Sequence, residues 1–365
     1  MNICLIGDGL TSLALAKNLI NKKINVFVYY KNIKQPIFQS RTIGISKNNF
    51  DFFNNKIIKL KKNMVWKVKQ IEIYSEKNKS EKIFNFKKSK EELFSIVKNH
   101  EVYKLLEDDL KKNKLFKKIL IKDNIFYEKI LKEKKYDLII NCDGSNKIAR
   151  DIFYKRIDKN YDSYAYTTII NHKKIKNLKA IQIFTKIGPI AFLPISNFET
   201  SVVFSIINER KVLSKDEVKN LIIQYNKIFI IKKFSKLESF KLKFSVSKNY
   251  YYKNLMAFGD TLHKIHPLAG QGFNMTLRDI KILSKIVKNR IDLGLPLDYS
   301  VYTEFENATK HFNFIFSFGI DFIHEFFKFD NKYKNNYSNK FLKFISKNKL
   351  FNNIIFKYAD KGLAI

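Results

Sequence analysis

The chain has 365 residues, 45% of them hydrophobic, which is enough material for one large α/β unit or two closely packed domains. Its formal net charge is +35, but Arg occurs at only six positions and every other basic residue is a Lys, spread among abundant Asn, Ile, Phe and Tyr. A surface selected to bind phosphates would favour bidentate Arg. The composition therefore indicates an AT-rich coding sequence and argues against a nucleic-acid partner, while leaving open a weak attraction to anionic membranes.

The two cysteines, Cys4 and Cys142, lie in apolar runs typical of strands. This placement predicts buried, reduced thiols with no disulfide and no metal site, as expected of a cytoplasmic protein. Asp8 and Gly9 interrupt the first apolar run, which argues against a signal peptide, and no uncharged apolar stretch is long enough to span a membrane.

The chain opens on a β-α-β pattern. Residues 2–6 form an apolar strand, followed by the turn Gly7-Asp8-Gly9, an amphipathic helix from about Leu13 to Asn21, and a second strand from Asn25 to Tyr30. In dinucleotide-binding folds the first glycine makes the tight turn and the second lets the backbone approach a pyrophosphate at the helix start. The segment predicts such a fold, with a glycine-containing turn that binds no ligand as the alternative.

Two positions depart from this pattern. Ser12 stands where a third glycine would allow close helix–strand packing, and a small residue is tolerated there. Tyr30 stands at the end of the second strand, where an acid usually accepts hydrogen bonds from a ribose diol, and a tyrosine cannot accept two. We expect either weaker cofactor binding or compensation from another residue.

Arg41 lies just before an apolar strand and a helix that begins near Asn48. Because the chain has so few arginines, this residue is a candidate contact for a cofactor or a phosphate. A surface Arg without such a role is the alternative.

The middle of the chain predicts a second, discontinuous domain. Residues 65–86 alternate in the manner of a hairpin, and residues 162–207 and 226–247 are again rich in strands, with a helix near 215–225. Between these parts, an apolar helical period within residues 93–112 predicts a helix that returns the chain to the first domain. We read the strand-rich parts as one antiparallel sheet inserted into the first domain.

Asp143 and Gly144 follow a continuously apolar run at 138–140, which is typical of a buried parallel strand. An acid at the carboxyl end of such a strand lies where α/β proteins bind ligands. The alternative is an Asp that merely caps the following helix.

The stretch from Phe258 to Asp279 carries the strongest local signal. An apolar lead-in is followed by Gly259 and Asp260, and then by Pro267 and a Gly270-Gln271-Gly272 turn that opens a helix. The start of a helix leaves backbone N–H groups unpaired and aimed outward, so the turn predicts a site for an anionic or electron-rich ligand. From residue 298 onward the chain is helical and aromatic, with charges that favour packing on the body over membrane insertion.

Three segments together resemble a known family, the class A FAD-dependent aromatic hydroxylases. They are Gly7-x-Gly9, Cys142-Asp143-Gly144 with Arg150, and Gly259-Asp260 followed by His266-Pro267-Leu-Ala-Gly270-Gln271-Gly272-x-Asn274. The last run, with Leu277-Arg278-Asp279 behind it, most resembles the ubiquinone-biosynthesis hydroxylases. Weaker similarity is present at 41–46, 97–99, 188–194 and 295–302, so the resemblance covers nearly the whole chain.

The resemblance implies an α/β fold in which a Rossmann-like FAD-binding domain carries an inserted antiparallel-sheet substrate domain, as in p-hydroxybenzoate hydroxylase, with helices at the C-terminus. We expect the FAD-binding domain at 1–64, 91–152 and 250–297, the substrate domain at 65–90 and 153–249, and the helical region at 298–365. The FAD-binding residues implied are Gly7, Gly9, Ser12, Tyr30, Arg41, Asn99, Asp143, Asp260, Pro267, Gly270, Gln271, Gly272 and Asn274. Lys147 departs from the small residue that the family has there.

The activity implied is hydroxylation of the ring of a polyprenylated phenol in ubiquinone biosynthesis, with FAD reduced by NAD(P)H and molecular oxygen added as a flavin C4a-hydroperoxide. No side chain is expected to act as a nucleophile, and His266, Pro267, Gly270 and Gln271 would face the flavin. For His263 and His266, packing and proton transfer both remain open. A ubiquinone-biosynthesis complex and peripheral contact with the inner face of the membrane are candidate partners. The alternatives are a flavin hydroxylase of a soluble aromatic compound and a flavoprotein-like scaffold with weakened turnover.

Overall fold

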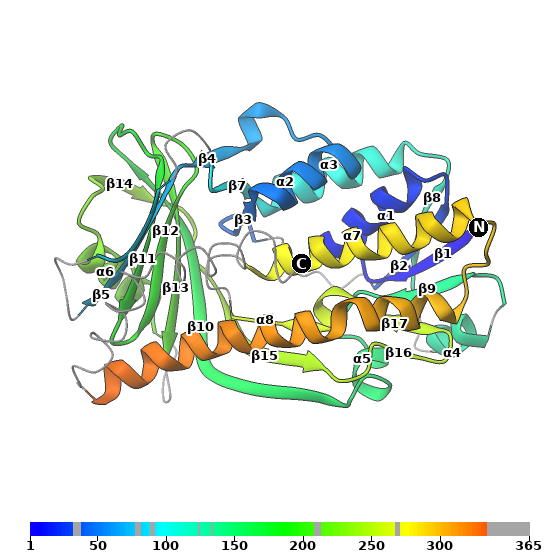
Figure 1. Cartoon of the computed structure of the whole chain (residues 1–365). Helices are drawn as coiled ribbons and strands as arrows, with labels where there is room; N and C mark the ends of the chain where they lie inside the picture. The colour runs from blue at the N-terminus through cyan, green and yellow to red at the C-terminus, as the bar shows by residue number, and fades with distance from the viewer. Residues whose placement is uncertain are drawn as a thin grey trace.

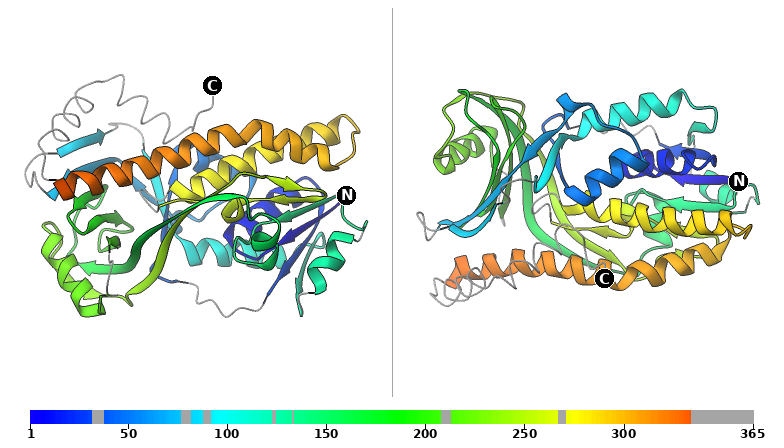
Figure 2. Two further views of the ribbon diagram at one scale, coloured as in Figure 1. Left: turned by 90° about the horizontal axis from the view of Figure 1, so that it is seen from below. Right: turned by 45° about the horizontal axis from the view of Figure 1, so that its top comes forward.

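The computed structural model describes residues 1–31, 38–76, 82–87, 92–122, 125–132, 134–207, 213–266 and 271–333. Two large sheets lie at opposite ends of the molecule, and one long helix, α8 (Tyr299–Tyr333), runs beside both (Figure 1). The other views show the same arrangement, with α7 (Gln271–Asp292) next to α8 (Figure 2). The mixed α/β fold expected from the sequence is confirmed.

The first sheet has six strands in the order β16-β17-β9-β1-β2-β8. They are β1 (Asn2–Ile6), β2 (Asn25–Tyr30), β8 (Phe116–Leu120), β9 (Leu138–Asn141), β16 (Tyr251–Tyr252) and β17 (Leu255–Ala257). All neighbours are parallel except β16 and β17. β1 from Ile3 to Ile6 and β9 from Leu138 to Ile140 are apolar because helices cover both faces of a parallel sheet.

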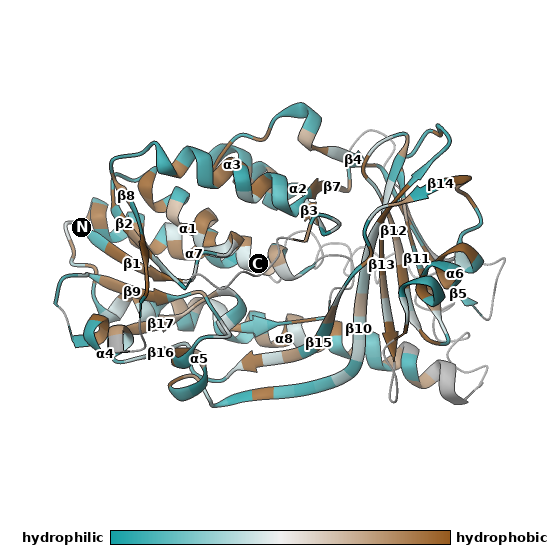
Figure 3. Ribbon diagram, turned by 180° about the vertical axis from the view of Figure 1, so that it is seen from behind, coloured by the Kyte–Doolittle hydropathy of each residue, from teal (hydrophilic) through white to brown (hydrophobic). Residues whose placement is uncertain are grey.

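Helices α1 (Leu10–Ile20), α3 (Asn99–Lys111), α4 (Ile125–Lys132), α5 (Lys147–Asp151) and α7 surround this sheet. α1 packs on β1 and β2, and it contacts both α3 and α7. α4 and α5 lie on the other side, near β9 and β16 (Figure 1). The largest apolar cluster of the protein fills this region, with Ile3, Leu5 and Leu13 fully buried. In Figure 3 the central strands β1 and β9 are brown and therefore hydrophobic.

The second sheet has nine strands, in the order β18-β15-β10-β13-β12-β11-β5-β6, with β14 also paired to β10. They are β5 (Gln70–Ser75), β6 (Lys82–Lys87), β10 (Arg156–His172), β11 (Lys179–Thr185), β12 (Gly188–Pro194), β13 (Glu199–Ile207), β14 (Ile231–Phe234), β15 (Glu238–Ser247) and β18 (His263–Lys264). α6 (Lys215–Tyr225) covers one face and begins with a capping box between Ser214 and Glu217.

The predicted strand-rich segments form this sheet, with two differences. β5 pairs with β11 in the parallel direction, so the sheet is not purely antiparallel. β18 comes from the segment expected to belong to the first domain, yet it pairs with β15. The sheets are therefore tied together just before α7 begins, and the domain boundaries given above remain a prediction.

A small third sheet lies between the two large ones and corrects the expected helix at 93–112. Its strands are β3 (Thr42–Ser46), β4 (Trp66–Val68) and β7 (Phe94–Lys98), in the order β3-β7-β4. Residues 94–98 are a strand because β3 and β4 pair with them on both sides, and the helix α3 starts only at Asn99. β4 belongs here and not to the hairpin formed by β5 and β6. α2 (Lys47–Lys56) follows β3 as expected.

α8 connects the two large sheets. Near its start, the Tyr302 hydroxyl accepts a hydrogen bond from the backbone N–H of Ile139 in β9, at 2.9 Å. Near its other end, Asp321 accepts a hydrogen bond from Tyr161 in β10, at 2.8 Å. Within residues that the structure describes, no helix is long and apolar enough to cross a membrane. Residues 334–365, the rest of the expected helical region, lie outside the described ranges.

Candidate functional site at the ends of three parallel strands

Three segments singled out in the sequence meet at one edge of the six-stranded sheet. β1, β9 and β17 are neighbours and parallel, so their carboxyl ends lie together. The alignment continues past the strands, because the N–H of Cys142 donates to the carbonyl of Ile6 at 2.9 Å and the N–H of Phe258 donates to that of Asn141 at 2.8 Å. Gly7, Asp143 and Asp260 are thereby brought to the edge where α/β proteins bind ligands.

The glycines allow these turns to approach one another. A Cβ added at Gly7 would lie 2.8 Å from the Cβ of Asp143, and one at Gly144 would lie 2.5 Å from the carbonyl oxygen of Asp260. Gly259 has a φ of +57° and faces Thr11, whose Cγ2 would lie 2.6 Å from an added Cβ. Gly7 also has a positive φ, of +100°. Only residues without a side chain fit at these positions.

Gly9 behaves differently, because a Cβ added there would meet nothing within 4 Å. Gly9 is also the N-cap of α1, and no side chain caps that helix. The start of α1 therefore presents backbone N–H groups to open space beside a glycine. Such an arrangement leaves room for a pyrophosphate to approach the backbone, and the role predicted for Gly9 stays a prediction.

Asp143 organises the turn after β9. Its carboxylate accepts hydrogen bonds from the backbone N–H and the hydroxyl of Ser145, at 2.8 and 2.6 Å. The N-cap of α5 is Asn146, whose side chain accepts from the N–H of Ala149 at 2.9 Å. The alternative role considered for Asp143, capping the following helix, is therefore wrong. Lys147 is the exposed first residue of that helix.

Ser12 and Cys142 occupy the packed side of this site. Ser12 is fully buried in α1, where the third glycine of the motif would lie. Cys4 and Cys142 are both buried, as expected, and they form no disulfide. Burial raises the pKa of Cys142 to about 12, so this thiol stays protonated beneath the strand ends.

Arg41 and Asn99 lie side by side on the small sheet. The N–H of Asn99 donates to the carbonyl of Arg41 at 3.0 Å, because β3 and β7 are antiparallel neighbours. Arg41 is exposed, with its guanidinium carbon 5.8 Å from the centroid of the Phe240 ring in β15. Both residues therefore lie between the two large sheets, where a long cofactor could reach them.

The segment around the start of α7 contains buried polar atoms that lack partners within the described ranges. They are the Oγ1 of Thr261, both ring nitrogens of His266 and the Oε1 of Gln271. Leaving such atoms unpaired costs free energy, which a polar ligand docked here would recover. A Cβ at Gly272 would come only to 3.9 Å from Ile265, and Asp260 is exposed. Pro267 and Gly270 lie outside the described residues.

Asn274 holds the start of α7 in place. Its Oδ1 accepts from the N–H of Ser46 at 2.9 Å and from the side chain of Asn49 at 3.0 Å, and its Nδ2 donates to the carbonyl of Gly44 at 2.8 Å. The side chain is therefore committed to β3 and α2. Its contribution to a ligand site is to position the helix whose first turn faces the ligand.

The two histidines of this segment have different environments. His263 is paired with the buried Asp279, with Nε2 2.7 Å from Oδ2, and Asn313 also donates to Asp279 at 3.0 Å. His266 stacks against His324 of α8, with ring centroids 4.3 Å apart, and both are buried. Burial holds the pKa of His266 well below its usual value, and the neighbouring His324 lowers it further. The ring of His263 is thus held by Asp279, whereas His266 is a neutral imidazole with unused hydrogen-bonding capacity.

The sequence reasoning missed two residues that the structure places at the site. Asp8, within the glycine turn, and Lys118, in β8, form an ion pair of 3.0 Å close to Tyr30. Asp8 could have been noticed in the sequence, because it is a carboxylate inside the glycine turn, whereas nothing in the sequence distinguishes Lys118. It is one Lys among many in a lysine-rich chain.

A parallel sheet with glycine turns at three adjacent strand ends is typical of the dinucleotide-binding class of α/β proteins, and here it is joined to a second sheet that is mainly antiparallel. A family comparison agrees with this class: residues 135–347 match the model described as squalene epoxidase. The chain belongs to the squalene epoxidase family. The resemblance read from the motifs is confirmed.

Among curated proteins, the chain is 24% identical over 240 residues to the mitochondrial ubiquinone biosynthesis monooxygenase COQ6 of Caenorhabditis elegans, a match that covers 53% of each chain. It is 28% identical over 197 residues to the 3-demethoxyubiquinol 3-hydroxylase of Escherichia coli, covering 50% of this chain and 49% of the relative. The chain thus matches about half the length of these relatives.

Solved structures show the same fold over the whole chain. The p-nitrophenol 4-monooxygenase PnpA of Pseudomonas putida aligns with a TM-score of 0.75 and 11% identity, covering 100% of this chain and 98% of that one. HpxO of Klebsiella pneumoniae, solved in complex with FAD and uric acid, aligns with a TM-score of 0.73 and 11% identity, covering 100% of this chain and 97% of that one.

Proposed function

We propose that this protein is an FAD-dependent monooxygenase that hydroxylates the aromatic ring of a polyprenylated phenol in ubiquinone biosynthesis. The observation that carries the proposal is the convergence of Gly7–Gly9, Asp143 and Asp260 at one sheet edge, in a chain whose curated relatives are ubiquinone hydroxylases. NAD(P)H and molecular oxygen are the co-substrates. The described residues contain no second glycine-rich nucleotide turn, so NAD(P)H would bind transiently.

The residues present fit FAD. The open start of α1 at Gly9 would receive the pyrophosphate, and Arg41 and Asn99 would lie along the cofactor. The unpaired atoms at Thr261, His266 and Gln271 would meet the polar edge of the ring system. When bound, FAD supplies the reduction by NAD(P)H and the activation of oxygen.

The chain itself contributes orientation and electrostatics. The N–H groups in the first turn of α7, from Gln271 to Phe273, lie at the positive end of the helix dipole and would stabilise negative charge on a group docked there. Asn274 fixes that turn against β3 and α2. The nine-stranded sheet, tied to the same segment through β18, would form the substrate side.

Purification tests the proposal directly. We expect yellow protein whose flavin is released as FAD, and oxidation of NAD(P)H with consumption of oxygen that a prenylated phenol stimulates. Matched assays with the same phenol lacking its prenyl tail give the control. Colourless protein that does not bind added FAD contradicts the proposal.

Two alternatives have specific outcomes in the same assays. Equal stimulation by the untailed phenol favours a hydroxylase of soluble aromatics. FAD binding without turnover on any phenol favours a scaffold role in a ubiquinone-biosynthesis complex, which Tyr30 at the position of the usual acid motivates. Mass spectrometry of the quinone intermediate that accumulates in a deletion strain would identify the ring position.

Peripheral contact with the inner face of a membrane, from a cytoplasmic location, is part of the proposal. Its support is an exposed apolar row on α8, formed by Ile315, Phe322 and Phe329 at intervals of seven residues, together with the net charge of +35. Flotation with vesicles containing anionic lipid tests it. Binding that neither requires anionic lipid nor weakens when Phe322 is replaced by Ser contradicts it.

A further inference from the structure

The cofactor motif of this chain lacks its ribose-binding acid, and the structure offers a replacement nearby. Tyr30, the last residue of β2, stands where an acid normally accepts the ribose hydroxyls. The Nζ of Lys118 lies 4.5 Å from the centroid of the Tyr30 ring. The Oδ2 of Asp8 lies 3.0 Å from the same Nζ. A carboxylate therefore reaches the end of β2 from the glycine turn after β1.

Lys118 determines where this carboxylate lies. It sits in β8 opposite Val28, and its Nζ also lies 2.8 Å from the Oε1 of Glu107 in α3. Burial disfavours the charged form of Lys118, but hydrogen bonds with Glu107 and Asp8 outweigh it and raise the pKa of Lys118 above its usual value. The lysine therefore stays charged and holds Asp8 in one position.

The carboxylates of Glu107 and Asp8 differ in how many partners they already have. Glu107 is occupied by Lys118 and by Lys111, at 2.8 and 3.2 Å, and its side chain is 19% exposed. Asp8 is 34% exposed and, within the described part of the chain, pairs only with Lys118 through Oδ2. Asp8 also lies between Gly7 and Gly9, next to the open side of the glycine turn. Of the two, Asp8 is the more exposed carboxylate, and its Oδ1 takes part in no ion pair within the described residues.

We propose that Asp8, positioned by Lys118, accepts the ribose hydroxyls of the adenosine half of FAD and takes over the role of the acid absent at position 30. This rests on the proposed function, because it assumes that FAD binds along the strand ends. In this arrangement Tyr30 supports the lysine through its ring and makes no hydrogen bond to the ribose. Asp8 then determines preference for the adenine dinucleotide over FMN, which has no adenosine.

Competition binding tests the proposal with a readout that is independent of turnover. ADP and 2′-deoxy-ADP are titrated against FAD bound to wild type, Asp8→Asn and Glu107→Gln, with flavin fluorescence as the signal. Hydrogen bonds to charged groups predict that wild type binds ADP at least about tenfold more tightly than 2′-deoxy-ADP. Asp8→Asn should lose this preference and bind FAD about tenfold more weakly, with FMN binding unchanged. Glu107→Gln should keep the preference.

The ratio between the two nucleotides is measured within one variant, so a partial loss of folded protein does not change it. Lys118→Met is a second test. This variant keeps the Asp8 carboxylate but no longer positions it, so it should prefer ADP over 2′-deoxy-ADP less strongly than wild type does. An Asp8→Asn protein that still prefers ADP overturns the proposal, as does one that loses FAD and FMN equally. A wild type that binds no FAD at all refutes the proposed function and is recognised before any variant is compared.

Discussion

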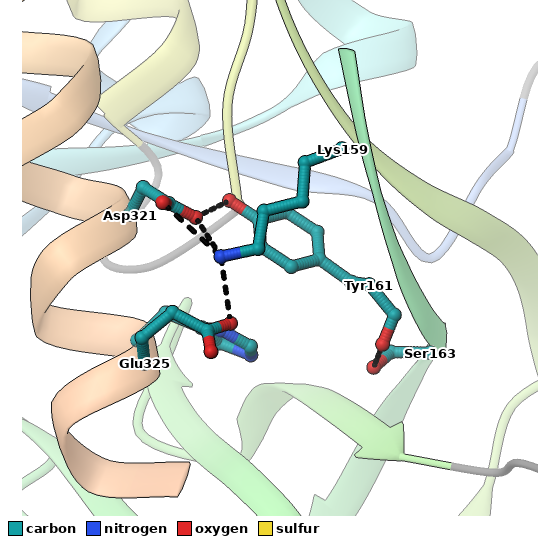
Figure 4. A network of polar contacts seen from close by, with 6 residues as sticks. Lys159, Tyr161, Ser163, Asp321 and Glu325 are labelled. Atoms are coloured by element: carbon teal, nitrogen blue, oxygen red, sulfur yellow. Dashed lines mark hydrogen bonds and ion pairs between the residues drawn. The ribbon is translucent and has the colours of Figure 1, made fainter. Parts of the chain in front are cut away.

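The two ends of the molecule are built by different means. At the strand ends of the six-stranded sheet, neighbouring turns approach so closely that there is no room for a Cβ at Gly7, Gly144 or Gly259; the nearest atom is a backbone oxygen at Gly144 and a side-chain carbon at the other two. At the junction of α8 with the nine-stranded sheet, contact is made through side chains: Tyr161 and Lys159 of β10 meet Asp321 and Glu325 of α8 (Figure 4). The first region is sensitive to added volume, and the second to charge.

The difference follows from what each region has to do. A cofactor site needs backbone N–H groups at fixed positions, and glycine turns supply them without titrating. The α8 junction fastens a helix to a sheet, with two stacked imidazoles, His266 and His324, buried beside Tyr161. Its strength should depend on pH, whereas that of the strand ends should not.

Adding one methyl group at the strand ends should have the largest effect. In Gly144→Ala the new Cβ would lie 2.5 Å from a backbone oxygen, which cannot move aside, so we expect a loss of about 3 kcal/mol in the free energy of unfolding. Urea denaturation measures it. Gly9→Ala is the matched control, since its Cβ meets nothing, and should cost less than about 1 kcal/mol. If both variants lose the same free energy of unfolding, the close approach at Gly144 does not contribute to stability.

The second largest effect is expected from acid, which should weaken the junction between α8 and the nine-stranded sheet. Burial holds the pKa values of His266 and His324 below 6.5, so below that pH the unfolded chain binds more protons than the folded one, and stability falls as pH falls. Each histidine contributes up to about 1.4 kcal/mol per pH unit until its folded pKa is reached. Urea denaturation from pH 7.5 to 5.5 measures the slope.

The carboxyl group next to His324 does not change that window. Burial would raise the pKa of Glu325, but its hydrogen bond and charge interaction with Lys159 outweigh burial and lower this pKa, so Glu325 stays ionised from pH 5.5 to 7.5. Replacing His266 by Phe should flatten the pH slope, and replacing the exposed His311 of the same helix as His324 should not. If stability still depends on pH in the same way after both His266 and His324 are replaced, other titrating groups cause that dependence.

Removing the carboxylate at the α8 junction should have a smaller effect. Asp321→Asn removes the ion pair with Lys159 and weakens the hydrogen bond from Tyr161, which predicts a loss of about 1 kcal/mol because Lys159 is partly exposed. Glu306→Gln, in an ion pair with Lys310 on the exposed side of the same helix, should change stability by less than about 0.5 kcal/mol. Thermal unfolding of both variants at pH 7.5 compares them.

The smallest change is expected at Cys142, beneath the strand ends. With a pKa of about 12, roughly one thiol in ten thousand is ionised at pH 8, and Cys142 is buried, so iodoacetamide should leave it unmodified in the native protein. Mass spectrometry after labelling, with urea-unfolded protein as the positive control, measures this. Rapid labelling of Cys142 in the native protein would mean that the strand ends open spontaneously. That result would contradict the close packing of their turns.

Much of the candidate site was accessible from the sequence because its information is local. A glycine at a tight turn, an apolar parallel strand and an acid after it are each fixed by a few consecutive residues, so Gly7, Asp143 and Asp260 could be named in advance. The helix expected at 93–112 was wrong only in its first residues, since α3 spans Asn99–Lys111. Phe94, Ile96 and Val97 favour strands, but the helical period of the residues that follow was extended over them; β3 and β4 pair with them on both sides.

By itself, the sequence determined the class of fold, the three glycine turns and the family resemblance, since short-range sterics and strand patterning specify them. Only the tertiary structure decided which acid lies beside Tyr30. Asp8, Glu107 and Lys118 come from three separate elements, and their ion pairs exist because β8 pairs with β2 and α3 packs above them. It likewise decided that His266 meets His324, which lies 58 positions further along the chain. Contacts between distant segments depend on how elements pack, and no local pattern records them.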